Sequence, residues 1–461
     1  MIALTLAEIA RAVGGTLVGG DPDTRVTGTV EHDSRRITPG GLFFAFPGEK
    51  VDGHDYAPTA MERGAVAVVG QRPVDAPTIV VEDPLRAIGL LATYVAPQLD
   101  ATIVGVTGSS GKTTTKDLVA QLVAELGPTI APAGSLNNEL GHPSTVLRAD
   151  ADTRFLVLEY SARHIGDIDY LCRIAGPRIA AVLNVGTSHI GEFGSQDNIA
   201  TAKGELIEAL PDTGLAILNA DDPRVRAMAP RTRARVVLVG EAADADVRAE
   251  DVTVDERGRA VFTLVTPEGS VPVALGVPGR HQVGNVLVAA AVGRELGMSP
   301  GQLGDILPRL RLVSARRMDV FDRRDGVTVI DDSYNANPAS MAAAVRSLAD
   351  MSGNGKRRSW AVLGYMAELG PEEVAGHESV GRLAAELGVD RLVAVGDGAG
   401  PLADGAEKVA GWAGEAVRVT DQEAAIALLG GALSPGDVVL VKGSRYRTWQ
   451  VADALREGLS A

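Results

Sequence analysis

The chain has 461 residues, and at about 100–200 residues per domain this length indicates three domains. The formal net charge is −15, from 44 Lys and Arg against 59 Asp and Glu, which disfavours nucleic acid and anionic membranes as general partners. The single cysteine excludes an intramolecular disulfide and fits a reducing compartment, so we expect a cytoplasmic protein.

Targeting signals are not evident in the sequence. The N-terminus has no basic region followed by a long apolar stretch, so we expect no signal peptide. No apolar run reaches about 18 residues, so we expect no membrane span.

Cys172 lies in the apolar run 168–174, where we expect a core residue rather than a nucleophile. We also expect a monomer.

The first domain is predicted at residues 1–98, as a small α/β unit. Its predicted elements are an amphipathic helix at 4–13 opened by Thr5, a strand at 41–46, a helix at 56–63 and a buried strand at 65–69.

The central domain is predicted at residues 99–313. An apolar strand at 101–107 runs into a Gly-rich turn and a helix at 112–126, and further strands are predicted at 155–158, 179–184, 215–219 and 235–239. Helical patterns between most of these strands indicate a parallel sheet covered on both faces. The segments 260–265 and 271–275 are typical of a hairpin that extends this sheet in the antiparallel sense.

The third domain is predicted at residues 314–461, as a smaller doubly wound, Rossmann-like fold. Strands are predicted at 327–330, 359–363, 391–395, 416–419 and 438–441, and helices at 341–349, 378–387, 422–429 and 448–455. We expect no NAD here, because a Gly-x-Gly-x-x-Gly fingerprint followed by an acidic residue is missing.

The turn after the strand at 101–107 carries the most informative motif, Gly108-Ser109-Ser110-Gly111-Lys112-Thr113-Thr114. Glycines let backbone N–H groups face phosphate oxygens, and the helix start adds its positive dipole end. Lys112 would supply charge to the outer phosphates, and Thr113 a hydroxyl for Mg²⁺. A strict P-loop needs glycine where Val106 stands, so the match is to the shorter Gly-x-x-Gly-Lys-Thr form. A plain Gly-rich turn would not explain the Gly, Lys and two Thr together, so we favour phosphate binding.

Three further polar residues follow strands of the same domain, where ligands gather in parallel sheets. Glu159 ends the strand at 155–158, His189 follows the strand ending at Asn184, and Lys203 lies early in a helix. A carboxylate and a neutral imidazole can hold Mg²⁺ when phosphates and waters complete the shell. Singly, each has an ordinary explanation as a surface charge, a loop hydrogen-bonding group or a solvated helix charge. Their joint placement beside the phosphate loop favours a functional site.

Over essentially its whole length the chain resembles the Mur ligase family. The matching motifs are Asp33-Ser34-Arg35, 41–45, Asp52-Gly53-His54, 108–114, 135–139 with Gly141 and Pro143, Glu159, 184–189, 202–205, 219–222, 279–281 with Asn285, Arg317, 331–338 and 441–444. The resemblance implies a UDP-sugar-binding first domain, a central ATP-binding P-loop domain, and a C-terminal domain that binds the amino substrate and closes over the nucleotide.

The resemblance also implies roles for individual residues. Lys112 would contact ATP phosphates, Arg317 the terminal phosphate, and Thr113, Glu159, His189 and a carbamylated Lys203 would hold Mg²⁺. The implied catalytic residues are Lys112, Lys203, His189, Glu159 and Arg317. The implied nucleotide site comprises Gly108, Ser109, Ser110, Gly111, Lys112, Thr113, Thr114 and Arg317, with Asn285, Tyr334 and Asn335 at the adenine and Asp331 or Asp332 at the ribose. The implied substrate-binding residues are Ser34, Arg35, Asn137, Asn138 and Lys442.

The Leu-Asn-Asn-Glu segment at 136–139 and the Asp-Ser-Tyr-Asn-Ala-Asn-Pro segment at 332–338 resemble one member's motifs in particular. The implied reaction is ATP-dependent joining of D-alanyl-D-alanine to UDP-N-acetylmuramoyl-tripeptide through an acyl phosphate, with release of ADP and phosphate, in peptidoglycan precursor synthesis. One alternative is the preceding ligase, which adds diaminopimelate or lysine, but its Asp-Asn-Pro-Arg motif is not found. A folylpolyglutamate synthase-like enzyme would lack the UDP-sugar domain. A non-catalytic nucleotide-binding switch would not need the proposed metal site.

Three positions depart from the family pattern. Tyr160-Ser161 follow Glu159, where Met or Leu and then Gly are commoner, and Tyr365 stands where an acidic residue is usual. Arg316 and Arg317 stand where the family has one key arginine. We favour Arg317 as the phosphate-binding residue because it directly precedes Met318.

Overall fold

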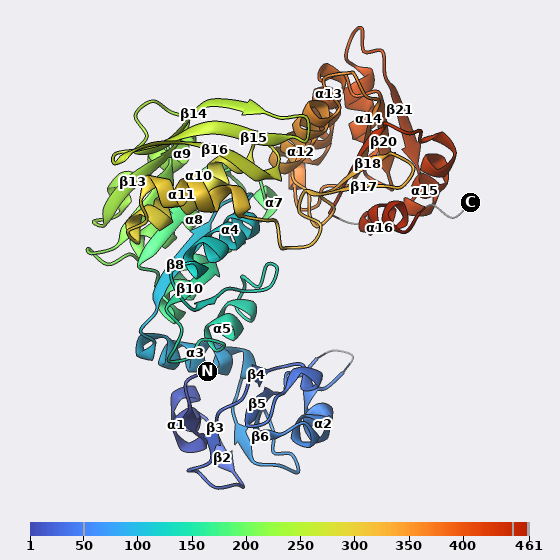
Figure 1. The fold of residues 1–461 in the computed structure, drawn as a ribbon. Coiled ribbons are helices and arrows are strands. Elements are labelled where there is room, and N and C mark those ends of the chain that lie inside the picture. Colours follow the sequence, from blue (N-terminus) through green and yellow to red (C-terminus); the bar gives the residue numbers. More distant parts are fainter. Residues whose placement is uncertain (49–50, 445–446, 459–461) are drawn as a thin grey trace.

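The computed structural model describes residues 1–48, 51–444 and 447–458, in which the strands form four sheets. Figure 1 shows three lobes, with the N-terminal lobe in blue at one end, the central lobe from cyan to yellow, and the C-terminal lobe from orange to red at the other end. The predicted α/β class is confirmed. The predicted boundaries near residues 98 and 313 stay predictions.

The N-terminal lobe is built on a sheet of order β2-β7-β6-β5-β4, beside a small β1-β3 pair. Its bounds are β1 Leu4–Thr5, α1 Leu6–Val13, β2 Thr16–Val18, β3 Arg25–Val26, β4 Val30–Glu31, β5 Gly41–Phe44, α2 Ala57–Glu62, β6 Ala65–Gly70, β7 Thr78–Val80 and α3 Pro84–Val95, with 3-10 turns η1 Ser34–Arg36 and η2 Gly53–Tyr56. The predicted first helix is confirmed, because Thr5 and Glu8 form a capping box that starts α1. The predicted strand at 41–46 ends two residues early, at Phe44.

The central lobe has a long sheet of order β16-β15-β14-β13-β12-β11-β8-β10-β9. Its strands are β8 Thr102–Thr107, β9 Thr129–Ile130, β10 Phe155–Glu159, β11 Ile179–Val182, β12 Leu215–Asn219, β13 Arg235–Gly240, β14 Val247–Val254, β15 Arg259–Thr266 and β16 Gly269–Pro278. Strands β8 to β14 pair in parallel, and β15 and β16 are antiparallel. The parallel sheet and its hairpin extension are confirmed, whereas β14 was not predicted.

Helices cover both faces of the central sheet, as predicted. Its helices are α4 Lys112–Ala124, α5 Gly141–Val146, α6 Asp167–Ile174, α7 Ile190–Phe193, α8 Gln196–Glu208, α9 Pro223–Arg226, α10 Gln282–Glu295 and α11 Pro300–Ile306. Helices α4, α10 and α11 share one apolar cluster with the sheet, and α5, α6 and α8 share the other. The second cluster continues into the N-terminal lobe through α3, so these two lobes share a core. Cys172 lies in it, where burial raises the pKa of its thiol.

The C-terminal lobe has a sheet of order β17-β18-β22-β19-β20-β21, parallel except for β17. Its bounds are β17 Asp319–Asp322, β18 Thr328–Asp331, α12 Pro338–Met351, β19 Ser359–Gly364, η6 Gly370–Glu372, α13 Glu373–Glu386, β20 Arg391–Val395, α14 Gly400–Glu407, β21 Glu415–Val419, α15 Gln422–Ala432, β22 Val438–Lys442 and α16 Trp449–Glu457. Helices α12, α13 and α14 cover one face, and α15 and α16 the other. The Rossmann-like prediction is confirmed, although β17 and α14 were not predicted.

The central and C-terminal sheets direct their strand ends toward one shared cavity of about 950 Å³. Residues that follow β8, β10 and β11 line it from the central lobe, and residues that follow β18, β19 and β22 line it from the C-terminal lobe. Parallel sheets commonly bind ligands at the carboxyl ends of their strands. None of the helices in the described residues is long and apolar enough to cross a membrane.

Candidate active site

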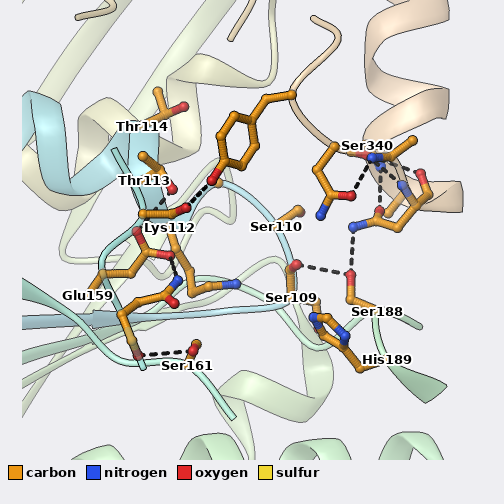
Figure 2. A pocket seen from close by; sticks show the side chains of 18 of the residues that line it. Ser109, Ser110, Lys112, Thr113, Thr114, Glu159, Ser161, Ser188, His189 and Ser340 are labelled. Atoms are coloured by element: carbon orange, nitrogen blue, oxygen red, sulfur yellow. Dashed lines mark hydrogen bonds between the residues drawn. The ribbon is translucent and has the colours of Figure 1, made fainter. Parts of the chain in front are cut away.

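The phosphate loop joins β8 to α4 and is held in shape by its neighbours. The backbone N–H of Ser109 donates to the Asn184 carbonyl at 3.0 Å, and that of Ser110 to the Asn184 side chain at 2.9 Å. Gly111 starts α4 with a left-handed φ of 80°, and a Cβ there would lie 2.8 Å from Oδ1 of Asn285. The first N–H groups of a helix have no intrahelical partners, so this end of the cavity is suited to an anion (Figure 2).

Lys112 and Thr113 lie at the start of α4, beside Glu159 (Figure 2). Lys112 Nζ donates back to the Gly108 carbonyl at 2.8 Å. Burial lowers the pKa of Lys112, Glu159 partly opposes this, and Arg317 lowers the pKa further.

The Glu159 carboxylate ends β10 and is 1% exposed. Thr113 Oγ1 donates to its Oε2 at 2.9 Å, and Asn137 Nδ2 donates to its Oε1 at 2.7 Å. The Ser161 hydroxyl in turn donates to the Asn137 carbonyl at 3.0 Å. Both carboxylate oxygens therefore have donors, one from the start of α4 and one from the loop that carries Asn137.

His189 lies at the start of α7 with a left-handed φ of 60° and lines the cavity. Its Nδ1 forms a hydrogen bond with Oε2 of Glu368, from the C-terminal lobe. Burial lowers the pKa of His189, and Glu368 partly opposes this. The lowered pKa favours the neutral imidazole, which is the form that binds metal ions.

Lys203 lies on α8 and is 4% exposed. Its amine has no hydrogen bond or ion pair with any part of the chain that the structure describes. Burial lowers the pKa of Lys203 well below its usual value, and Lys112 lowers it further. Unlike the other predicted metal ligands, Lys203 is not among the residues that line the cavity, although it is near enough to Lys112 for that charge to lower its pKa.

The predicted metal ligands fit Mg²⁺ only in part. Glu159, His189 and Thr113 line the same cavity. However, within residues 1–48, 51–444 and 447–458, no group of three or more His, Cys, Asp and Glu side chains lies close enough to hold a metal ion. Because Mg²⁺ prefers oxygen ligands in octahedral geometry, further oxygens would have to come from phosphates, water or a carbamate.

The side chains of the adjacent residues Arg316 and Arg317 lie in different surroundings. Arg317 lines the cavity with its Cζ 4.1 Å from the Tyr334 ring centroid, and its buried Nε has no hydrogen-bond partner among the described residues. Arg316 instead pairs with Asp453 at 3.0 Å and does not line the cavity. The geometry favours Arg317 as the cation that faces a ligand.

As with the two arginines, only some of the predicted adenine and ribose residues line the cavity. Asn285, Tyr334, Asn335 and Asp332 line the cavity, whereas Asp331 does not. The Asp331 carboxylate is buried and accepts hydrogen bonds from the Ser333 backbone and hydroxyl. Of the two aspartates, Asp332 is therefore the one that can reach a ligand.

Of the predicted substrate-binding residues, Asn137, Asn138 and Lys442 line the cavity. The Lys442 amine is already paired with the Asp332 carboxylate and donates to the Asn335 carbonyl at 2.9 Å. Ser34 and Arg35 lie in the N-terminal lobe and are not brought to this cavity: Ser34 is buried, and Arg35 forms an ion pair with Asp33.

Sequence reasoning missed several lining residues, among them Glu368, Arg163, His164 and Gln282. A signal existed for Arg163 and His164, because they follow β10 closely and loops after parallel strands form sites.

The two tyrosines that depart from the family pattern, Tyr160 and Tyr365, are explained by packing. The Tyr160 hydroxyl donates to the Ala175 carbonyl, and Tyr365 donates to Glu373 at 2.6 Å while its ring stacks on His377.

Fold and site together define a phosphate-binding α/β protein whose ligand cavity is shared by a central parallel sheet and a second doubly wound sheet. The lobes already meet across this cavity, since Asn337 Nδ2 donates to the Ser188 hydroxyl at 2.6 Å and the Tyr334 hydroxyl contacts that of Ser135.

Comparisons with known proteins identify the family. Residues 106–293 match the Mur ligase middle domain, residues 316–445 the Mur ligase glutamate ligase domain, and residues 28–92 the Mur ligase family catalytic domain. The chain is 50% identical to the UDP-N-acetylmuramoyl-tripeptide–D-alanyl-D-alanine ligase of Mycobacterium bovis, over 99% of this chain and 98% of that protein. It is 37% identical to the ligase of the same name from Escherichia coli, over 99% of both chains.

Solved structures agree with the sequence relatives. MurF from Acinetobacter baumannii superposes with a TM-score of 0.87 at 31% identity, over 99% of both chains. The MurF ligase of Thermotoga maritima in complex with ADP superposes with a TM-score of 0.80 at 29% identity, over 94% of this chain and 98% of that one. The chain belongs to the Mur ligase family.

Proposed function

We propose that the protein is an ATP-dependent, ADP-forming ligase that joins D-alanyl-D-alanine to UDP-N-acetylmuramoyl-tripeptide in peptidoglycan precursor synthesis. The observation that carries the proposal is a phosphate loop facing a cavity closed by a second lobe, in a chain that matches ligases of this name over nearly its whole length. The ADP complex of the Thermotoga maritima enzyme supports ATP as the nucleotide.

The reaction must bring a peptide carboxylate against a triphosphate, and both are anionic. The loop N–H groups, Lys112 and Arg317 supply positive charge at one end of the cavity, which is the arrangement that phosphoryl transfer requires. Transfer of the γ-phosphate to the carboxylate gives an acyl phosphate, and attack by the dipeptide amine then expels phosphate. The short contacts between the two lobes favour exclusion of water from that acyl phosphate.

We propose that Thr113, Glu159, His189 and a carbamylated Lys203 hold Mg²⁺. When bound, Mg²⁺ would offset the charge of the phosphate oxygens. The Lys203 amine is buried without a partner among the described residues, and burial lowers its pKa well below the usual value. This favours the neutral amine, whose nitrogen can bond to CO₂ and release a proton. The carbamate would supply the anionic oxygens that the His, Asp and Glu side chains here do not complete by themselves.

For the remaining ligand contacts, we propose that Asn285, Tyr334 and Asn335 contact the adenine and Asp332 the ribose. Asn137 and Asn138 would contact the peptide of the acceptor, whose UDP end would reach toward Ser34 and Arg35 in the N-terminal lobe. For Lys442 we retain only an indirect role through Asp332, because its amine is already paired. A cytoplasmic location and a monomeric state stay predictions from the sequence.

A substrate panel that measures ADP release tests the proposal. We expect ADP when the enzyme receives ATP, Mg²⁺, UDP-N-acetylmuramoyl-tripeptide and D-alanyl-D-alanine, and little ADP when any one is omitted. Product from a diamino acid and the dipeptide acceptor, with none from D-alanyl-D-alanine, would assign the protein to the preceding step. ATP binding without ADP release for any substrate would indicate a non-catalytic switch.

A further inference from the structure

Glu368 belongs to the C-terminal lobe, between β19 and η6, yet it contacts residues of the central lobe. Its carboxylate Oε2 forms a hydrogen bond with Nδ1 of His189, and its Oε1 lies 3.8 Å from the guanidinium of Arg163. Its backbone carbonyl also accepts from the N–H of Gly191 at 3.3 Å. A single residue of the C-terminal lobe thus contacts two segments of the central lobe, around His189 and Arg163.

The backbones around this contact are built for close approach. His189 and Glu368 both adopt left-handed φ angles, 60° and 64°, which are unusual for residues with side chains. A Cβ on Gly370 would lie 3.0 Å from Cα of Gly191, and a Cβ on Gly191 would lie 3.1 Å from the Gly370 nitrogen. The helical turns α7 and η6 therefore pack backbone to backbone, which fixes where the Glu368 carboxylate meets the imidazole.

We propose that Glu368 is a positioning residue that orients His189 for metal binding and couples that binding to closure of the two lobes. The inference rests on the proposed function, of whose metal site His189 is a part. The hydrogen bond to a carboxylate favours the tautomer of His189 that carries its proton on Nδ1. The lone pair of Nε2 is then left for a metal ion, as in carboxylate–histidine–metal arrangements.

The coupling follows from where Glu368 lies. Because the carboxylate and the imidazole belong to different lobes, the hydrogen bond exists only when the lobes are together. If closure of the lobes makes metal binding more favourable by a given free energy, a bound metal makes closure more favourable by the same free energy. The reason is that the coupling free energy is reciprocal. The lobe that is expected to bring the amine substrate thus also completes the metal site of the other lobe.

Binding of Mn²⁺ as a probe, in the presence of a non-hydrolysable ATP analogue, tests this role without measuring activity. Free Mn²⁺ is followed by electron paramagnetic resonance for the wild type, Glu368→Ala, Glu368→Gln, His189→Ala and the double variant Glu368→Ala with His189→Ala. The matched control is Glu372→Ala, an exposed glutamate of the neighbouring η6. We expect Glu368→Ala to raise the Mn²⁺ Kd by about 10–100-fold, and Glu372→Ala to leave it unchanged.

The double variant decides how Glu368 acts. If it acts through His189, the double variant binds Mn²⁺ no more weakly than His189→Ala alone. Additive losses would make Glu368 an independent ligand and overturn the inference. Weak binding by His189→Ala with normal binding by Glu368→Ala would overturn it too, while leaving the proposed function in place.

The remaining outcomes separate this inference from the proposed function and from misfolding. If the wild type binds no Mn²⁺ with the analogue, the proposed metal site fails and the inference fails with it. Glu368→Gln keeps an acceptor oxygen for Nδ1–H, so we expect a smaller rise in Kd than for Glu368→Ala. Should Glu368→Ala unfold, Glu368→Gln carries the test, and a Kd equal to that of the wild type in the folded Gln variant would overturn the inference.

Discussion

Two buried lysines of the central lobe, Lys116 on α4 and Lys203 on α8, lie in opposite electrostatic surroundings. Their exposed fractions are 0% and 4%, and their helices cover opposite faces of the sheet. The Lys116 amine pairs with the Asp117 carboxylate and donates to the Pro132 carbonyl at 2.6 Å. The Lys203 amine has no such partner in the described parts of the chain, and its pKa is lowered by burial and by Lys112.

The difference shows that burial alone does not decide what a lysine does. A buried cation is tolerated when a carboxylate and further hydrogen bonds satisfy it, and the Lys116–Asp117 pair then serves the structure. The other oxygen of Asp117 accepts from the Ser314 hydroxyl at 2.5 Å, which ties α4 to the segment that leads into the C-terminal lobe. Burial of an amine without a partner instead lowers its pKa, which favours the neutral and nucleophilic form.

Replacement of Lys203 should give the largest effect. We expect Lys203→Met to reduce ATP-dependent turnover by roughly 1,000-fold or more, since a metal ligand is worth several kcal/mol of transition-state stabilisation. The thermal unfolding temperature should stay equal or rise, because a buried unpaired amine is removed. ADP release and thermal unfolding measure the two effects.

Labelled bicarbonate sharpens this test. With carbon-13 bicarbonate, the wild type should show a carbamate carbon signal by NMR that is missing from Lys203→Met, while Lys116 gives none. Turnover of Lys203→Met within about tenfold of the wild type, or a wild type without a carbamate signal, would contradict the assignment.

Replacement of Lys116 should act on stability instead. We expect Lys116→Met to lower the free energy of unfolding by about 3–5 kcal/mol, because the Asp117 carboxylate is left buried without its cation. Adding Asp117→Asn should restore part of the loss. The matched control is Lys408→Met, whose lysine pairs with Glu378 on the surface and should change stability by about 1 kcal/mol at most. Urea unfolding measures the free energy of unfolding of both variants. Equal losses in the two would show that the buried pair stabilises the protein no more than the exposed pair.

His142 extends the comparison to a weaker base, and here the effect depends on pH. Neither ring nitrogen has a hydrogen-bond partner among the described residues, and burial lowers the pKa of His142 from 6.5 to about 4. Above pH 6.5 the ring is neutral in both the folded and the unfolded chain. As the pH falls from 6.5 toward 4, the unfolded chain takes up the proton first, so stability is lost across this window.

The size of that loss follows from the same shift. One pKa unit corresponds to about 1.4 kcal/mol, so His142 should account for at most about 3.5 kcal/mol of acid destabilisation. We expect His142→Leu to flatten the dependence of the unfolding temperature on pH between 6.5 and 4. Parallel curves for the variant and the wild type would show that another group titrates.

Much of the fold was predictable because apolar strands alternate with amphipathic helices. The strands β12 and β20 were predicted with the bounds that the structure has, and most other elements to within a few residues. The strand β14 was missed because Arg248, Glu250 and Asp251 interrupt its apolar pattern where the strand is exposed. The helix α14 was missed because it begins with Gly400 and Pro401, which are typical of a turn.

The candidate site was predictable where residues follow strands and not where lobes meet. Glu159 and His189 were found because Glu159 ends β10 and His189 lies in the segment after β11. The bond between His189 and Glu368 joins residues 179 positions apart, and it depends on how two separately folded sheets dock. The choice of Asp332 over Asp331 depends on a local turn around Ser333, which a one-dimensional pattern does not specify.

The single cysteine has a practical consequence. Cys172 is 7% exposed in the core shared by the N-terminal and central lobes, and burial raises the pKa of its thiol. Because the thiolate is the reactive form, this side chain should resist maleimide dyes while the protein is folded. Pairs of cysteines introduced on the outer helices α1, α11 and α15 would then carry fluorophores on an unreactive background. Energy transfer between them would follow the distances between lobes during a single turnover.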